Sequence, residues 1–241
     1  MASADSDDEL ALSSSTLDAL KSFYAERDAH SEKFAKLQAE AEERLAGSGT
    51  LSMDMFTEDW NESQFWYSDE TATLLADQLL TGATNETTIA VVSAPSVFVA
   101  LKNVVNASNG PKPKMVLLEH DNRFNVFGEE FIFYDFAQPL IEYKAHLKGS
   151  IDRFIVDPPF LSEDCQTKAA LTVRWMAKSV EDTKLVLCTG ERMETLVTKV
   201  YRAFGLKTTD YEPVHARGLS NEFYCYANFE ADGVWKWRAE C

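Results

Sequence analysis

The segment Ile151–Phe160, with the sequence IDRFIVDPPF, decides the fold that this chain is expected to adopt. Its first half is an apolar run rich in β-branched and aromatic residues, which is typical of a buried strand. The run stops at Asp157-Pro158-Pro159, because proline lacks the N–H that a sheet ladder needs. The residue before a proline is held near extended geometry, so the two prolines stiffen the turn. We therefore expect a carboxylate and an exposed ring, Phe160, at the carboxyl edge of a strand, where open α/β sheets bind ligands.

The size and composition of the chain are those of a folded cytosolic protein. The sequence has 241 residues, of which 45% are hydrophobic and 12% aromatic, enough for a substantial core. No apolar run approaches the length of a membrane span, and the acidic N-terminus is unlike a secretory or mitochondrial signal. The 4 cysteines form no C-x-x-C pair, so we expect reduced thiols and no metal site.

The net charge of −16 favours a basic protein partner over a nucleic acid. A phosphate backbone would be repelled by the average surface, and no basic cluster stands out in the sequence. Opposite net charges favour encounter with a basic protein. Charge alone leaves a nucleic-acid substrate open, because an acidic enzyme can carry a basic cleft.

Strands and helices alternate through most of the chain, which predicts a doubly wound, mostly parallel α/β sheet. Besides the strand in the opening segment, strands are predicted at Thr88–Ser93, Lys114–Glu119, Glu130–Tyr134, Lys184–Cys188, Thr208–His215 and Glu222–Phe229. Helices are predicted to start at Ser68–Glu70, to run from the Ala94–Ser96 turn to Val105, and to cover Ser162–Ser179 and Glu191–Phe204.

We expect three parts along the chain. Residues 1–14 are acidic and serine-rich and are predicted to be a disordered tail, residues 15–50 a helical extension, and residues 51–241 the α/β domain. Within the domain, the segment Phe65–Tyr67 places three aromatic rings directly before a predicted helix. Three neighbouring rings cannot all point inward, so we expect one of them to line a surface or a pocket.

Three consecutive predicted strands end in acidic residues, namely Glu119, Asp135 and Asp157. Parallel neighbours bring their carboxyl ends to one edge, so these carboxylates should converge. A carboxylate such as Glu119 can accept from both hydroxyls of a ribose, and an Asp135 followed by Phe136 suits an adenine. The turn after the first strand, Ser93–Ser96, lacks the glycines of a phosphate-binding loop. Together these features predict a site for a nucleoside without phosphates.

Four segments together resemble the eukaryotic elongation factor 1A lysine methyltransferase 1 family, which was earlier described as N6-adenine DNA methyltransferases. They are Gln64–Ser68 (QFWYS), Ser93–Ser96 (SAPS), Leu117–Glu119 (LLE) and Asp157–Phe160 (DPPF). The DPPF motif is shared with adenine methylases, so by itself it indicates methyl transfer to an amino nitrogen better than it indicates a substrate. Its combination with QFWYS is more specific, and the resemblance extends over Leu51–Phe229.

The resemblance implies a Rossmann-like class I methyltransferase fold, with a seven-stranded sheet whose last strand is antiparallel, and S-adenosylmethionine as the methyl donor. It assigns catalysis to Asp157, Pro158, Pro159 and Phe160. It assigns cofactor binding to Trp66, Tyr67, Ser93, Ala94, Pro95, Ser96, Glu119, Asp135, Phe136 and Asp157. It further implies a cytoplasmic monomer that methylates a lysine on elongation factor 1A, a protein substrate with a basic surface.

The expected reaction is attack by a neutral amine on the donated methyl group. Free lysine has a pKa of about 10.4, so its ammonium group must lose a proton first. Burial beside the positively charged donor lowers the amine pKa, because both effects disfavour a second cation. Asp157 and the carbonyl of Pro158 are expected to accept the amine hydrogens, while Phe160 walls the amine channel and favours the cationic product.

Three other interpretations account for parts of the sequence. DPPF could be an ordinary turn, since Asp and Pro are common turn residues. An N6-adenine methyltransferase acting on RNA or DNA would use the same motif, with Phe160 stacked on a flipped base. An inactive binding module would hold a partner through the N-terminal helix. The negative charge argues against the nucleic-acid enzyme, and the intact DPPF motif argues against the inactive module.

Overall fold

The computed structural model describes residues 50–53, 56, 65–218 and 222–239, together with six isolated positions between 21 and 39. These six positions are helical. The predicted tail at residues 1–14 and almost all of the predicted extension at residues 15–50 lie outside the described residues, so both stay predictions.

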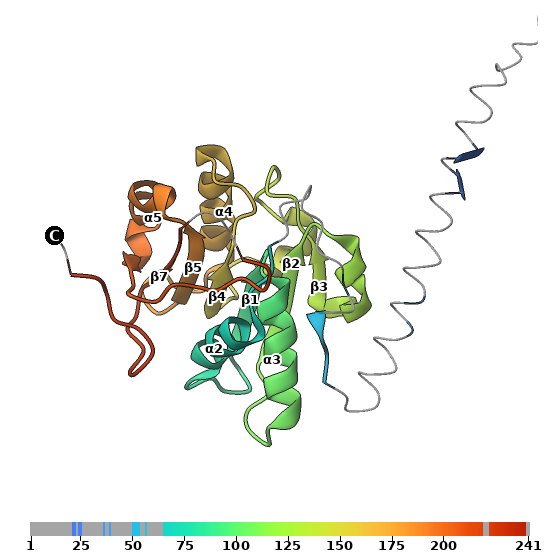
Figure 1. Cartoon of the computed structure of the whole chain (residues 1–241), viewed down its shortest axis with the longest axis horizontal. Helices are drawn as coiled ribbons and strands as arrows, with labels where there is room; N and C mark the ends of the chain where they lie inside the picture. The colour runs from blue at the N-terminus through green and yellow to red at the C-terminus, as the bar shows by residue number, and fades with distance from the viewer. Residues whose placement is uncertain are drawn as a thin grey trace, which may run out of the picture.

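A seven-stranded sheet forms the centre of the molecule (Figure 1). Its strands are β1 (Thr88–Val92), β2 (Lys114–Glu119), β3 (Phe131–Phe133), β4 (Arg153–Val156), β5 (Lys184–Gly190), β6 (Lys207–Thr208) and β7 (Phe223–Ala227). Their spatial order is β3-β2-β1-β4-β5-β7-β6. Strands β1 to β5 pair in parallel, and β7 is antiparallel to both of its neighbours. The prediction of a class I methyltransferase sheet, mostly parallel with an antiparallel last strand, is confirmed.

Helices cover both faces of this sheet (Figure 1). The α-helices are α2 (Asp69–Leu80), α3 (Pro95–Ala107), α4 (Glu163–Met176) and α5 (Glu194–Val200). The 3₁₀ segments are η3 (Asn122–Glu130), η4 (Glu142–Leu147), η5 (Glu191–Met193) and η6 (Arg202–Phe204). Two helices begin as their sequences predict, because the hydroxyls of Ser68 and Ser162 accept bonds from the first turns of α2 and α4.

The core has two layers, one on each side of the sheet. Successive strand residues point to opposite faces, so Val91 packs with α2 and α3 whereas Val92 packs with α4 and α5. The alternation predicted for the last strand holds, since Cys225 lies in the first layer and Tyr226 in the second. Apolar residues on both faces are typical of a parallel sheet covered by helices.

The largest difference from the prediction is at the penultimate strand. We predicted Thr208–His215, but β6 ends at Thr208. The amide of Thr209 still bonds to the carbonyl of Cys225 on β7, and Thr209 also bridges to Trp237. Beyond it the segment is irregular, because Pro213 lacks the N–H that a continued ladder would need, and His215 bridges to Tyr67.

Two predicted helices differ in extent. The helix predicted over Ser162–Ser179 ends at Met176, because Ala177 forms a parallel bridge with Ile151. The helix predicted over Glu191–Phe204 is divided into η5, α5 and η6. The amide of Glu191 bonds to the carbonyl of Glu222, so this residue continues the sheet ladder before the helix begins.

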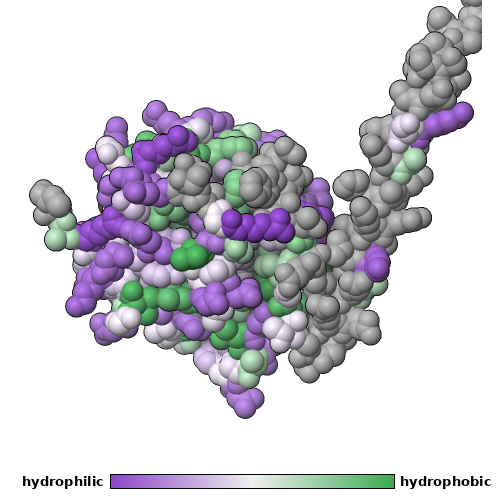
Figure 2. Space-filling model, viewed as in Figure 1, coloured by the Kyte–Doolittle hydropathy of each residue, from purple (hydrophilic) through white to green (hydrophobic). Residues whose placement is uncertain are grey.

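Hydrophilic residues surround several separate hydrophobic areas on the face drawn in Figure 2. Among the described residues, no helix is long and apolar enough to cross a membrane. The same part of the chain contains no cluster of three or more His, Cys, Asp or Glu side chains suited to a metal ion.

Candidate active site

Hydrogen bonds beyond the strand ends tie the predicted site segments together. The amide of Asp157 bonds to the carbonyl of Val92, which joins the end of β4 to the end of β1 at 2.9 Å. The amide of Ser93 bonds to the carbonyl of Leu118 at 2.9 Å, and Tyr134 N–H bonds to the carbonyl of Glu119 at 2.9 Å. Four neighbouring strands therefore place their loops at one edge of the sheet, as their parallel order requires.

The carboxyl group of Asp157 follows β4 at this edge. Its Oδ2 atom accepts a hydrogen bond of 2.6 Å from the hydroxyl of Tyr67. Burial and the nearby Glu119 carboxyl raise the pKa of Asp157 to about 8, although the bond from Tyr67 acts in the opposite direction. A carboxyl with a pKa in this range can exchange a proton near neutral pH, as a general base must.

Glu119 lies at the end of β2 and is buried. Its Oε1 atom accepts bonds from the amides of His120 at 2.7 Å and Asp121 at 3.2 Å. Burial raises the pKa of Glu119 to about 7, while these two amides lower it. Because both amides bind the same oxygen, Oε2 is left for a ligand hydroxyl, as the predicted ribose contact requires.

The Ser93–Ser96 turn adopts a glycine-like shape without a glycine. Ser93 has a φ of 56°, a left-handed conformation that non-glycine residues rarely adopt. Ala94 and Pro95 follow, and Pro95 occupies the first turn of α3, where its missing N–H does no harm. The buried Ser96 completes the turn. The absence of glycine in the sequence therefore did not prevent a tight turn between β1 and α3.

Asp135 and Phe136 follow β3 at the same edge. The Oδ1 atom of Asp135 accepts from the amide of Ala137 at 2.8 Å, so this carboxylate shapes its own turn. The ring of Phe136 packs edge-on against the ring of Phe160, with centroids 5.5 Å apart. The Lys168 ammonium group lies 5.9 Å from the Phe136 centroid, at the outer limit of a cation–π contact, and pairs with Asp164.

The DPPF turn has a further support that the sequence did not reveal. Gln166 on α4 is fully buried, and its Nε2 atom donates to the carbonyl of Phe160 at 3.1 Å and to the hydroxyl of Thr189 at 3.0 Å. Pro158 is buried and Pro159 is half-buried, whereas Phe160 is 42% exposed. The nearness of Gln166 to DPPF in sequence is the only local signal of this role, because the bond to Thr189 joins segments that are distant in sequence.

The predicted site residues thus divide into a set that interacts around Asp157 and a residue, Asp135, whose carboxylate bonds within its own loop. Tyr67, Glu119 and Asp157 interact directly or through their charges. Trp66 and Tyr67 are both buried, and the hydroxyl of Tyr67 bonds to Asp157. Asp135 lies at the same edge with its carboxylate turned toward its own loop.

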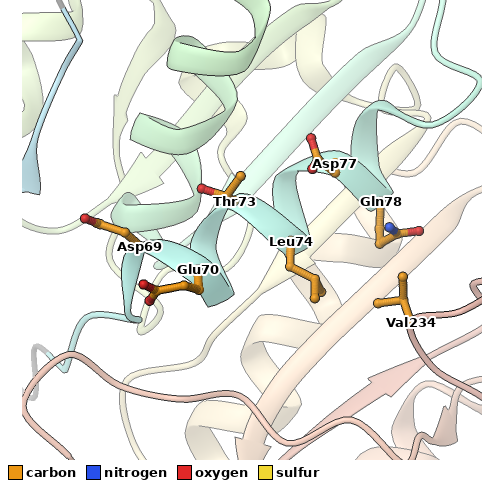
Figure 3. Close-up of a pocket in the computed structure, with 7 residues that line it drawn as sticks. All are labelled: Asp69, Glu70, Thr73, Leu74, Asp77, Gln78 and Val234. Atoms are coloured by element: carbon orange, nitrogen blue, oxygen red, sulfur yellow. The ribbon is translucent and has the colours of Figure 1, made fainter.

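A separate pocket lies along the outer side of α2 (Figure 3). It has a volume of about 550 Å³ and is lined by Asp69, Glu70, Thr73, Leu74, Asp77, Gln78 and Val234. None of the residues predicted for catalysis or cofactor binding lines it. The candidate active site is therefore at the sheet edge around Asp157 and not in this pocket.

Comparison with known proteins agrees with this assignment. The family described as "Probable N6-adenine methyltransferase" matches residues 58–231. Protein-lysine N-methyltransferase EFM5 of Saccharomyces cerevisiae is 43% identical, over 93% of this chain and 94% of the relative. EEF1A lysine methyltransferase 1 of Gallus gallus is 41% identical, over 93% of this chain and 96% of the relative. The Homo sapiens protein of the same name is 36% identical, over 96% and 97%.

The chain belongs to the EEF1A lysine methyltransferase 1 family. The resemblance seen in the four sequence segments is thereby confirmed, and so is the prediction that the protein is a methyltransferase. The family model carries an adenine-methylase description, whereas relatives that match most of this chain are named protein-lysine methyltransferases. In this chain the DPPF segment lies directly after the carboxyl end of β4.

Proposed function

We propose that this protein transfers a methyl group from S-adenosylmethionine to a lysine side chain of translation elongation factor 1A. The observation that carries the proposal is Asp157, which lies at the carboxyl end of β4 with one oxygen held by Tyr67 and a pKa of about 8. The names of the relatives indicate the substrate, and the residues of the site indicate the reaction.

The residues at the sheet edge fit S-adenosylmethionine. Within the part of the chain that the structure describes, no lysine or arginine forms an ion pair with Glu119 or Asp157, and the charge of Glu119 raises the pKa of Asp157. Arg123 acts on Glu119 through its charge, although its guanidinium pairs with Asp121 at 2.6 Å. Two buried carboxyls of this kind suit a ligand that carries both hydroxyls and a positive charge. When bound there, the donor supplies a methyl group on a positively charged sulfur, which an amine can attack.

Each site segment has a role in holding this donor. Glu119 would accept from the ribose hydroxyls through Oε2, and the Ser93–Ser96 turn would lie along the amino-acid part. Asp135 and Phe136 would contact the adenine, through the second carboxylate oxygen and the ring face. All three segments are connected to the end of β4 by the hydrogen bonds between neighbouring strands.

Asp157 would accept the proton or hydrogen bond of the incoming amine. A cation beside this carboxyl lowers its pKa, because an opposite charge favours the ionised form. Asp157 therefore changes from a group that is protonated at neutral pH to one that can accept from an amine. The Pro158 carbonyl would accept a second amine hydrogen, and the stiff double-proline turn limits the motion that must be frozen when the amine is aligned.

Phe160 would line the entrance for the lysine side chain. Its exposed ring lies against Phe136, where the Lys168 ammonium group already approaches an aromatic face. A methylated ammonium product would be stabilised in the same way. The ring is also hydrophobic enough to cover the aliphatic part of a lysine side chain.

The test is transfer of a labelled methyl group to purified elongation factor 1A, with RNA and DNA as separate acceptors. We expect label on the protein, and Asp157→Ala should reduce its rate at least about 100-fold while binding of S-adenosylmethionine persists. Asp164→Ala is the matched control, because this exposed acid pairs only with Lys168 on α4. Full activity of Asp157→Ala, or label on nucleic acid alone, would contradict the proposal.

A further inference from the structure

Tyr67 is fixed in place by a short clasp formed by two segments, Trp66–Ser68 and Val214–Ala216. The amide of Ser68 donates to the carbonyl of Val214 at 2.8 Å, and Ala216 N–H donates to the carbonyl of Trp66 at 2.9 Å. Between these bonds, Tyr67 and His215 form an antiparallel bridge. Ser68 also caps α2, so the backbone on the helix side of Tyr67 has little freedom.

The ring of Tyr67 is fixed as firmly as its backbone. It is 3% exposed and packs at 4.9 Å from the ring of His215, which in turn packs edge-on against Phe223 at 4.9 Å. Burial lowers the pKa of His215 to about 4, so this imidazole is neutral at physiological pH and does not repel or attract Asp157 through a charge.

From this rigid position the Tyr67 hydroxyl reaches across 90 residues of sequence to Asp157. A distance of 2.6 Å is in the range of a hydroxyl that donates to an ionised carboxylate. Burial and the Asp157 carboxyl raise the pKa of Tyr67 well above its ordinary value of 10.0, so the phenol keeps its proton and stays a donor.

We propose that Tyr67 is a positioning residue that orients the Asp157 carboxylate, holding Oδ2 and leaving Oδ1 for the substrate amine. This inference rests on the proposed role of Asp157 in methyl transfer. It adds the residue that orients the Asp157 carboxylate and lowers its pKa. A hydrogen bond to the ionised form makes Asp157 a stronger acid, so the same contact keeps the carboxylate available at lower pH.

The titratable groups that face Asp157 come from three elements and from the Tyr67 segment, and among the described residues Tyr67 is the one that donates to it. They are Tyr67, Glu119 on β2, Cys165 on α4 and Cys188 on β5. Burial raises the pKa of both thiols, to about 11 in the case of Cys165. Glu119 carries a negative charge when ionised and therefore opposes ionisation of Asp157. The hydrogen bond from Tyr67 thus lowers the pKa of Asp157, which burial and the charge of Glu119 raise.

The first test is the pH dependence of Tyr67→Phe, which removes the hydroxyl and keeps the ring that packs on His215. We expect kcat to fall about 10- to 100-fold with little change in KM for the protein substrate, because the Asp157 carboxylate is no longer held in one orientation. The acidic limb of kcat/KM should move to higher pH by about one pH unit, since a bond to a charged group is lost.

Tyr211→Phe is the matched control, because that hydroxyl bonds to Thr71 on α2 at 3.1 Å and not to Asp157. It should lose comparable stability without any shift of the pH profile. If Tyr67→Phe lowers the melting temperature but leaves the pH profile in place, Tyr67 has only a structural role and the inference is overturned.

The second test does not depend on the substrate. The side-chain carboxyl carbon of Asp157 is titrated by NMR in the wild type and in Tyr67→Phe, with Asp157→Asn used to assign the signal. The inference requires a higher pKa in Tyr67→Phe, and equal values would refute it. If the wild type fails to methylate elongation factor 1A but this shift is present, the proposed substrate is wrong and the positioning contact stands.

Discussion

At the scale of single residues, the site combines groups whose usual properties are changed by their surroundings. Ser93 takes a backbone conformation that glycine usually provides, and Glu119 and Asp157 hold their protons to about pH 7 and 8. Both carboxyls are affected first by burial, which disfavours their charged forms. Strained backbone and buried ionisable groups of this kind cluster at functional sites, where ligand binding can compensate for their energetic cost.

The raised pKa of Asp157 predicts a pH-dependent stability. Between its ordinary value of 3.8 and about 8, the folded protein keeps a proton on Asp157 that the unfolded chain has released. The folded state therefore binds more protons, and stability falls as pH rises through this window, by up to about 1.4 kcal/mol per pH unit for one group. Asp157→Asn should flatten this fall when urea unfolding is measured from pH 5 to 8 without cofactor.

Asp164→Asn should keep the wild-type slope, because Asp164 is an exposed acid in a surface ion pair. Equal slopes for the wild type and Asp157→Asn would show that Asp157 ionises normally in the folded protein. Glu119 contributes a slope of the same sign in all three proteins and does not affect the comparison.

At the scale of elements, a buried arginine on the sheet bonds to the end of α2. Arg153 on β4 donates to the carbonyls of Leu79, Thr81 and Gly82 at 2.7, 2.8 and 2.8 Å. These carbonyls lie at the end of α2, where no following helical turn supplies N–H donors for them. The same helix begins after its cap Ser68, which follows Tyr67, so Arg153 holds the far end of the helix that leads out of the candidate site.

Replacement of Arg153 should therefore destabilise the fold. Arg153→Met keeps an apolar stem but leaves buried carbonyls unpaired, and we expect the free energy of unfolding to fall by about 3–5 kcal/mol. Arg153→Lys should lose less, because one ammonium group can still bond to part of the set. Urea denaturation measures both. Arg174→Met on the exposed side of α4 is the control, and its free energy of unfolding should change by no more than about 0.5 kcal/mol. A similarly small change for Arg153→Met would disprove the role of Arg153 in holding α2.

At the scale of the whole molecule, charge governs encounter with the proposed substrate. The chain carries a net charge of −16, and the face in Figure 2 is largely hydrophilic. An acidic surface attracts a basic protein over distances that salt reduces to about 8 Å at physiological ionic strength. Association with elongation factor 1A is therefore expected to depend on long-range attraction as well as on contacts at the DPPF turn.

An increase of salt from 50 to 500 mM should lower kcat/KM for the protein substrate about 10-fold, mainly through KM. The same increase should change the Kd of S-adenosylhomocysteine much less, because this small ligand has almost no net charge. Steady-state assays and calorimetry at matched ionic strength measure the two quantities. A kcat/KM that is constant or rises with salt would exclude electrostatic attraction as a source of substrate binding.

Much of the fold and the location of the site could be predicted from local sequence. The apolar run before Asp157 ends at two prolines because proline cannot continue a ladder, and the structure ends β4 at Val156. Ser68 and Ser162 start helices for equally local reasons. The alternation of strands and helices indicated a parallel sheet, and that order brings Glu119 and Asp157 to one edge.

Other features were decided only by tertiary structure, because they depend on segments that are distant in sequence. No local pattern shows that the Tyr67 hydroxyl bonds to Asp157, that Arg153 binds the end of α2, or that Thr209 forms a bridge with Trp237. Each of these contacts exists because the sheet order places one segment beside another. The sequence by itself therefore determined which residues stand at the ends of the strands, whereas the packing of the chain determined which of them are oriented, buried and able to exchange a proton.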